Sequence, residues 1–284
     1  MPADEASTSA SSLSVLFWGV RGSVACPGPA TLRYGGNTPC VEVRCGPHTL
    51  IFDAGTGIRQ LGNALVKARN TNDFDIFLSH GHIDHMVGLP FFAPLFVTGQ
   101  VVRVWAGTLQ PSGGVKEAVR KLMSFPFFPL QVDALHAKLE FHDFRAGDVI
   151  NPRPGVTLRT APLNHPGGAI GYRIEYGGRS IAYVTDIELG DGPIDPALLA
   201  LTKDVALIIL DTTYTDEELP SHEGWGHSSW QQGIRLANAV GAGQLCLFHH
   251  DPDHDDAFMD KVKTASAAAR PGTIVATEEM QLDS

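Results

Sequence analysis

The sequence predicts an α/β fold in which β-sheets pack together and helices flank them. Short apolar runs, separated by turns rich in glycine or proline, fill the first third of the chain and are typical of successive strands. After Leu78, helical patterns alternate with further strand-like runs. We expect helices at 84–97, 114–124, 195–202, 228–240 and 255–269, and strands at 15–18, 41–43, 50–52, 76–78, 101–106, 156–161, 169–176, 179–185, 204–210 and 243–248.

Length and composition are compatible with one large domain. The chain has 284 residues, 43% of them hydrophobic, which is enough to bury a sizeable core. No internal repeat and no linker rich in glycine, serine or proline divides the sequence. We therefore expect a single domain over residues 13–284, preceded by a disordered tail at 1–12, where the residues are small and polar.

The charge balance argues against a long nucleic acid as partner. The chain carries 21 Lys and Arg against 31 Asp and Glu, a net charge of −10. Proteins that grip a long phosphate backbone usually present a basic surface that releases condensed counterions. A small anionic substrate stays open, because a local basic pocket can exist within an acidic chain.

The cysteines and the apolar runs indicate a cytoplasmic protein without a membrane segment. No apolar run approaches membrane-spanning length, and residues 1–12 lack the basic and apolar regions of a secretion signal. The four cysteines have no C-x-x-C spacing, so we expect them to be reduced and structural.

The strongest chemical signal is the segment 79–85, which places three imidazoles and one carboxylate within six residues after an apolar strand. In an extended loop His80 and His82 point to the same side, whereas Asp84 and His85 begin the next element and address a neighbouring position. This arrangement favours two metal ions over one. Nitrogen and oxygen ligands without thiolate favour zinc, with manganese and iron as alternatives.

Three more residues with ligand side chains follow later strands: His165, Asp186 and His249. Taken singly, each is better interpreted as a structural residue. Strand ends are where sites assemble, however, and the joint occurrence with the segment 79–85 predicts one metal centre. Either His249 or His250 could be the ligand, and the position directly after the strand favours His249.

The H-x-H-x-D-H loop with its spaced His, Asp and His resembles the signature of the metallo-β-lactamase superfamily over nearly the whole chain. The resemblance implies an αββα sandwich of two mixed sheets flanked by helices, with two Zn²⁺ per chain. The bridging position holds an aspartate, Asp186, which differs from the antibiotic-hydrolysing branch. Phosphodiesterases, glyoxalase II and lactonases share this pattern of ligands. The implied ligands are His80, His82 and His165 for one metal, Asp84, His85 and His249 for the other, and Asp186 as the bridge.

Two further motifs resemble the ribonuclease Z and cyclic phosphodiesterase branch. The segment 226–229 is similar to its His-Ser-Thr motif, and Asp211 ends a strand where that family carries an acidic partner, more usually Glu. The resemblance implies that His227 and Asp211 protonate the leaving oxygen, since a carboxylate orients an imidazolium and raises its pKa. The alternative is that Ser228 caps the following helix and His227 is incidental.

The segments 17–23, 33–38 and 53–57 are similar to the first strands of bacterial hydrolases of this subfamily. Asp53 is interpreted as orienting the metal loop and not as binding metal. Arg21 and Arg33 are expected to form surface salt bridges, with phosphate contact as the alternative. The remaining histidines lie outside motifs and are expected at the surface: His48, His136, His142, His222 and His254.

The sequence shows no basic arm like the one that grips tRNA in ribonuclease Z, and the segment 91–130 is instead rich in phenylalanine and proline. Core packing, a lid, base stacking and a dimer contact are its alternative interpretations. We expect a homodimeric, binuclear zinc phosphodiesterase that converts cyclic mononucleotides to nucleoside monophosphates. Asp84, Asp211 and His227 are the expected catalytic residues. The alternatives are a thioester or lactone hydrolase, a tRNA 3′-processing endoribonuclease, and a metal-binding module without turnover.

Overall fold

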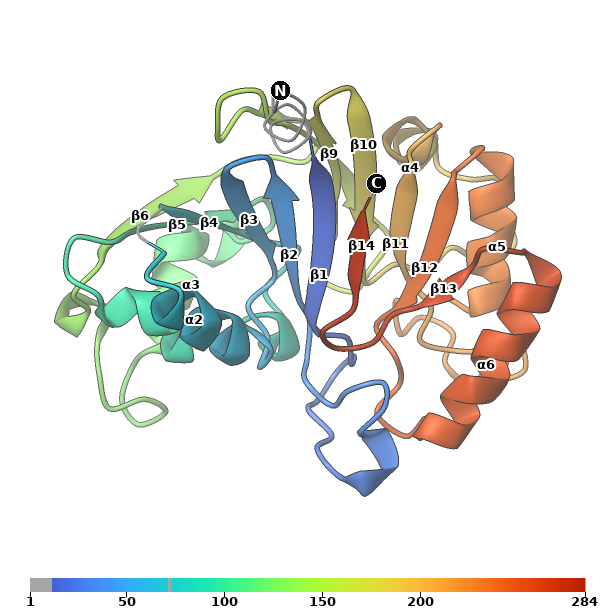
Figure 1. The fold of residues 1–284 in the computed structure, drawn as a ribbon, viewed down its shortest axis with the longest axis horizontal. Helices are drawn as coiled ribbons and strands as arrows, with labels where there is room; N and C mark the ends of the chain where they lie inside the picture. Colours follow the sequence, from blue (N-terminus) through green and yellow to red (C-terminus); the bar gives the residue numbers. More distant parts are fainter. Residues whose placement is uncertain (1–11, 71–72, 284) are drawn as a thin grey trace, which may run out of the picture.

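The structure is a computed structural model that describes residues 12–70 and 73–283, and it consists of two facing β-sheets with helices on the outer side of each (Figure 1). These layers confirm the predicted αββα sandwich of two mixed sheets flanked by helices. The expected disordered tail at 1–12 lies outside the described residues except for Ser12.

The first sheet has seven strands in the order β14-β1-β2-β3-β4-β5-β6. Pairing is antiparallel from β14 to β3 and parallel from β3 to β6, so the sheet is mixed. The strands are β1 (Leu13–Gly19), β2 (Cys40–Cys45), β3 (His48–Phe52), β4 (Phe74–Leu78), β5 (Val101–Ala106), β6 (Lys138–Asp143) and β14 (Gln281–Asp283).

The second sheet also has seven strands, in the order β13-β12-β11-β10-β9-β8-β7. β10, β11, β12 and β13 are parallel, and both β8 and β10 run antiparallel to β9. The carboxyl ends of β8, β10, β11 and β12 therefore lie at the same edge. The strands are β7 (Val149–Ile150), β8 (Thr157–Leu163), β9 (Ala169–Tyr176), β10 (Arg179–Val184), β11 (Leu207–Asp211), β12 (Gln244–Phe248) and β13 (Ile274–Val275).

Apolar side chains fill the three spaces between the layers. Phe52 of β3 packs against Tyr183 of β10 between the sheets, with ring centroids 5.6 Å apart. Leu61 belongs to the cluster under the helices of the first sheet, and Leu198 to the cluster under those of the second. The helices are α2 (Ile58–Lys67), α3 (Gly114–Leu122), α4 (Pro196–Thr202), α5 (Trp230–Ala239) and α6 (Asp256–Ala269).

The helix expected at 84–97 is wrong. Pro90 and Pro94 have no backbone N–H to donate and clash with the preceding turn, so a continuous α-helix cannot pass through them. Three short 3₁₀ turns replace it: Ile83–His85, Leu89–Phe91 and Ala93–Phe96.

The other expected helices and the longer strands lie within a few residues of their predicted places. Helix α2 and the strands β6, β7, β13 and β14 were not predicted. All four cysteines are free, as expected, and three of them are buried. Among the described residues, none of the helices combines the length and apolarity needed to cross a membrane.

Candidate metal centre and active site

The predicted ligand residues come together because the strands that carry them end at the same place. His80 follows β4, His165 follows β8, Asp186 follows β10 and His249 follows β12. The chain after His80 forms a short 3₁₀ turn at Ile83–His85, and this turn brings His82, Asp84 and His85 to the same point. Residues more than 160 positions apart in sequence thus form one group, which is buried except for His82.

The first cluster contains His80, His82, His165 and one oxygen of Asp186. The His165 Nε2 atom lies 3.1 Å from His82 Nδ1 and 3.7 Å from Asp186 Oδ1. The His80 Nε2 atom lies 3.8 Å from the same oxygen. This His80 atom is buried and has no hydrogen-bond partner among the described residues.

The second cluster contains Asp84, His85, His249 and the other oxygen of Asp186. The Nε2 atoms of His85 and His249 are 3.4 Å apart. Asp84 Oδ2 lies 3.2 Å and 3.5 Å from these two nitrogens, and Asp186 Oδ2 lies 3.1 Å and 3.4 Å from them. Asp186 therefore presents one oxygen to each cluster.

The donor set fits divalent metal ions. Four donors at the usual zinc distance of about 2.0–2.1 Å, placed tetrahedrally, are separated by roughly 3.3–3.4 Å, and the measured separations of 3.1–3.8 Å scatter around that value. A buried polar atom normally has a hydrogen-bond partner, and His80 Nε2 has none among the described residues. A metal ion would fill that place. Both clusters can hold a metal.

Outer hydrogen bonds fix the orientation of four imidazoles. The Asp53 carboxylate accepts from His85 Nδ1 at 2.8 Å, and also from the Ser79 backbone N–H and the Tyr183 hydroxyl, both at 2.7 Å. Such partners occupy one ring nitrogen and leave Nε2 facing the cluster. The Nδ1 partners are Ser79 for His80, Asp53 for His85, the Gly226 carbonyl for His165 and Thr213 for His249.

His250 lies outside both clusters. Its Nε2 atom donates to the Ala276 carbonyl at 2.8 Å, and burial lowers the pKa of its imidazolium to about 3. Of the two neighbouring histidines, His249 therefore faces the second cluster and His250 does not.

Asp211 and His227 form a direct pair beside the clusters. His227 Nδ1 lies 2.7 Å from Asp211 Oδ2, and the His227 ring stacks on His249 with centroids 5.0 Å apart. Burial lowers the pKa of His227, but the Asp211 carboxylate outweighs burial and raises that pKa to about 9. Cations bound nearby would oppose this rise. The pair can hold and deliver a proton.

The helix-cap alternative named the wrong residue, because the segment 226–229 caps α5 through Ser229 and not Ser228. The Ser229 hydroxyl accepts from the Gln232 N–H at 3.0 Å, and the Gln232 side chain accepts from the Ser229 N–H at 3.2 Å. Ser228 instead accepts from the Leu189 N–H and donates to the Ile187 carbonyl. It thereby holds the loop that follows Asp186.

Two predictions about other polar residues are wrong. Arg21 is fully buried and donates to the carbonyls of Gly35, Asp251 and His254, so it ties two loops together and forms no surface salt bridge. His254 is also buried, with its Nε2 atom 2.8 Å from Glu218. Two further histidines of the surface group, His136 and His222, are exposed and partly exposed.

Arg33 does form the expected salt bridge. Its guanidinium is half-exposed and lies 2.7 Å from Asp260 and 3.6 Å from Asp256. It therefore joins the loop after β1 to helix α6.

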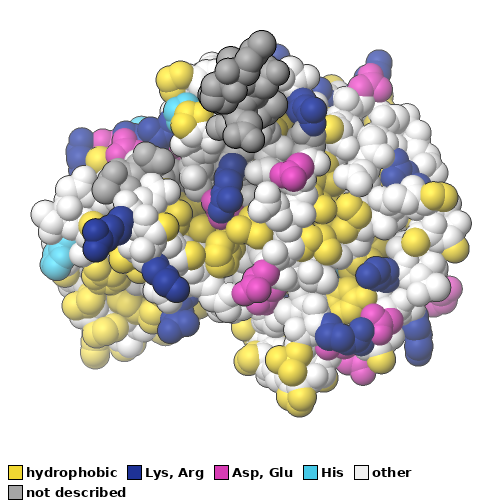
Figure 2. Space-filling model, viewed as in Figure 1, with side chains coloured by type: hydrophobic (Ala, Val, Ile, Leu, Met, Phe, Trp, Pro, Cys, Tyr) yellow, Lys and Arg dark blue, Asp and Glu magenta, His cyan; other side chains and the backbone are white. Residues whose placement is uncertain are grey.

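Part of the segment 91–130 is exposed and not packed in the core. Phe125 and Phe127 are 87% and 84% exposed, whereas Phe92 is buried. Hydrophobic side chains gather at the lower left of the molecule as Figure 2 views it. Core packing thus explains only part of the aromatic content of this segment.

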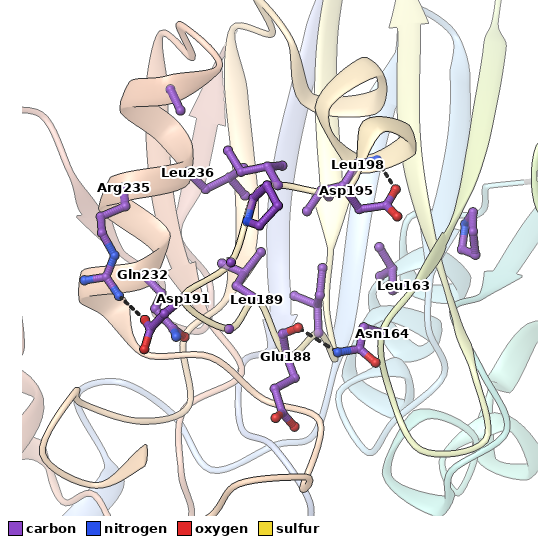
Figure 3. Close-up of a pocket in the computed structure, with 17 residues that line it drawn as sticks. Leu163, Asn164, Glu188, Leu189, Asp191, Asp195, Leu198, Gln232, Arg235 and Leu236 are labelled. Carbon is purple, nitrogen blue, oxygen red and sulfur yellow. Dashed lines mark hydrogen bonds and ion pairs between the residues drawn. The ribbon is translucent and has the colours of Figure 1, made fainter. Parts of the chain in front are cut away.

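A cavity of about 880 Å³ lies behind the loop that follows Asp186 (Figure 3). Leu163, Leu198 and Leu236 form its apolar wall, and Asn164 and Arg235 stand at its polar side. None of the cluster residues lines it. The cavity is thus separate from the candidate metal centre.

Sequence reasoning missed three residues that support the clusters: Tyr183, Thr213 and Glu188. Tyr183 contacts Asp53 only after the sheets have packed, whereas Thr213 donates to Asp211, two residues before it, and to the His249 carbonyl after the neighbouring strand. Glu188 binds two backbone N–H groups of the loop that carries His227. The only sequence signal for Glu188 is its place two residues after Asp186.

The beta-lactamase superfamily domain matches this chain over residues 48–250, which is more than half of its length. The chain belongs to the β-lactamase superfamily. Its fold and its two His and Asp clusters make it a metal-dependent hydrolase of the metallo-β-lactamase type. The resemblance stated from the segment 79–85 is confirmed.

Relatives of this superfamily member include ribonuclease Z, and proteins of the same fold include a diphosphatase. It is 23% identical over 266 residues to ribonuclease Z of Myxococcus xanthus, covering 77% of this chain and 83% of the relative. The metallo-beta-lactamase fold protein YhfI of Bacillus subtilis has a TM-score of 0.71 and 17% identity over 96% of this chain and 100% of its own. A diphosphatase of the PhnP family has a TM-score of 0.70 and 17% identity over 96% and 97% of the two chains.

Replacing Asp53 with Asn should weaken metal binding about 10- to 100-fold, because the His85 ring loses the carboxylate that orients it. Titration of the metal-free protein with zinc against a competing chelator would measure the change. Thermal unfolding of the metal-free variant is the control for stability. Unchanged affinity would show that Asp53 serves only the packing between the sheets.

Proposed function

We propose that the protein is a binuclear metal-dependent phosphodiesterase that hydrolyses a small phosphodiester. Cyclic mononucleotides are the proposed substrates and nucleoside monophosphates the products. The observation that carries the proposal is the Asp211–His227 pair, with its 2.7 Å contact, directly beside two clusters that share Asp186. A homodimer is also part of the proposal, with the aromatic segment 91–130 as one candidate for its contact.

The cofactors are proposed to be two Zn²⁺ per chain, with Mn²⁺ or Fe²⁺ as alternatives. Bound there, such ions supply Lewis-acid charge for the phosphoryl oxygens and a water of lowered pKa. His80, His82 and His165 would hold one ion, and Asp84, His85 and His249 the other. Asp186 would bridge them through its two oxygens.

His227 is proposed to be the general acid. Its Nδ1–H donates to the buried Asp211 carboxylate, which leaves Nε2 to hold the proton for the departing oxygen. Asp211 itself is fixed, because its carboxylate also accepts from the N–H groups of Ile187 and Thr213, both at 3.1 Å. His227 therefore keeps its orientation during the reaction.

An acid of this kind favours phosphodiesters over thioesters. A ribose alkoxide is a poor leaving group and needs a proton in the transition state, whereas a thiolate departs without one. Asp84 was expected to be catalytic as well as a ligand. Its Oδ2 atom faces His85 and His249 and accepts from the Ser23 N–H at 2.8 Å, so we assign it to holding metal.

A second candidate function is RNA processing, because the relative from Myxococcus xanthus is named ribonuclease Z. That name weakens the expectation, drawn from the charge, that no long nucleic acid binds. The net charge of −10 still favours a small anionic substrate, since it works against counterion release along an extended backbone.

A substrate panel separates the two candidates. The metal-reconstituted protein should turn over cyclic mononucleotides far better than precursor tRNA, with thioesters and lactones as further members of the panel. Efficient removal of a tRNA 3′ trailer at physiological salt, without turnover of cyclic nucleotides, would reverse this ranking.

The metal content tests the shared bridge. Elemental analysis should give two metal ions per chain, and Asp186→Ala should weaken the binding of both, because each cluster loses one oxygen. His250→Ala is the matched control, since His250 lies beside the second cluster but donates to a backbone carbonyl. Loss of only one metal in Asp186→Ala would make Asp186 a terminal ligand.

The leaving group tests the acid. His227→Ala should reduce kcat/KM on a cyclic nucleotide by ~100- to 10,000-fold, the usual contribution of a general acid. On bis(nitrophenyl) phosphate the loss should be small, because a nitrophenolate departs without a proton. Asp211→Asn should show the same selectivity more weakly. An equal loss on both substrates, with metal content intact, would mean that His227 shapes the site and is not the acid.

A further inference from the structure

The loop that carries His227 presents one exposed tryptophan at its tip. Trp225 is 60% exposed and precedes His227 by two residues. Its neighbours in the chain are polar or glycine: Ser221, His222, Glu223 and Gly224. An isolated aromatic ring in a polar loop is not the centre of an apolar protein–protein interface, which needs surrounding apolar side chains that exclude water.

The backbone on both sides of Trp225 is held by one carboxylate. The Gly224 N–H donates to one oxygen of Glu188 at 3.1 Å, and the Gly226 N–H donates to the other at 2.9 Å. In Figure 3 the Glu188 carboxylate extends away from Leu198 and Leu236, on the opposite side from the cavity wall. The loop tip is thereby tied to the chain two residues beyond Asp186.

The residue that follows Trp225 must be glycine, because its backbone lies close to the metal centre. Gly226 has φ 87°, and a Cβ atom placed on it would lie 2.2 Å from His165 Nδ1. The Gly226 carbonyl accepts from that nitrogen at 2.8 Å. The residue next to Trp225 therefore contacts a cluster imidazole directly.

A series of aromatic rings connects Trp225 with His227. Trp225 meets His222 edge to face at 4.8 Å between centroids, and His222 stacks on Tyr214 at 4.2 Å. Tyr214 in turn lies edge-on to His227 at 6.0 Å. These contacts hold the indole on one side while most of its surface stays open to solvent.

We propose that Trp225 is the stacking platform for the nucleobase of the substrate, an inference that rests on the proposed nucleotide phosphodiesterase function. With the phosphate at the two clusters, the nucleobase attached to the sugar would lie against the loop that carries His227. In that loop Trp225 exposes a flat aromatic face. Every base has a π-face, so a single platform serves purines and pyrimidines. Because the backbone is already held, little conformational entropy is lost when the base stacks.

The experiment compares two substrates that differ only in the base: a cyclic mononucleotide and the corresponding ribose cyclic phosphate without a base. Trp225→Ala should reduce kcat/KM on the nucleotide by roughly 5- to 150-fold, mainly through KM, as loss of base stacking does. The base-free substrate should change less than about twofold, since it uses the same acid and clusters. Trp225→Phe should retain most of the activity.

Val149→Ala is the control, because Val149 is a 51% exposed hydrophobic residue on the edge strand β7, outside the loop that carries His227 and outside segment 91–130. It should leave kcat/KM on both substrates unchanged. An equal loss on both substrates in Trp225→Ala would overturn the stacking role while leaving the proposed function intact. Absence of turnover of any phosphodiester by the metal-loaded wild-type protein would overturn the proposed function, and the stacking role with it.

Discussion

The shared carboxylate of Asp186 is the contact on which the arrangement of the site depends. Its Oδ1 atom faces the nitrogens of His80 and His165, and its Oδ2 atom faces those of His85 and His249. A side chain this short reaches both groups only if β4, β8, β10 and β12 all end within a few ångströms of it. The parallel pairing of β10, β11 and β12 and the antiparallel β9 between β8 and β10 meet that requirement for the second sheet. Strand β4 belongs to the first sheet, so its end reaches Asp186 through the packing of the two sheets.

Each buried carboxylate in and around the two clusters needs specific partners to remain charged. Moving a carboxylate out of water costs several kcal/mol unless partners replace the lost hydration. Burial raises the pKa of Asp186, but the surrounding imidazoles outweigh burial and hold that pKa well below its usual value. Asp53 and Asp211 are equally buried and accept several hydrogen bonds each. The cluster imidazoles that have outer hydrogen-bond partners are therefore held in fixed orientations.

The strands and the clustering of the His and Asp side chains were predictable because both depend on local patterns: apolar runs, and polar side chains directly after them. The helix expected at 84–97 failed because periodicity was given more weight than Pro90 and Pro94. Helix α2 was missed although Ile58, Leu61 and Leu65 recur on one face. The contacts of Glu188 leave no local pattern, since its partners lie 36 and 38 residues away and meet it only after folding.

Backbone conformation gives an independent reason to interpret the strand ends around the two clusters as functional. Asp53, Asp186 and His249 have φ of 62°, 56° and 62°, in the left-handed region, each within two residues of a strand end. A residue with a side chain costs about 1–3 kcal/mol there, and glycine would avoid that cost. Stability of the fold alone would thus favour glycine at these turns. The left-handed turn instead directs a carboxylate or imidazole over the end of the sheet, so the strain is retained where the side chains are needed together.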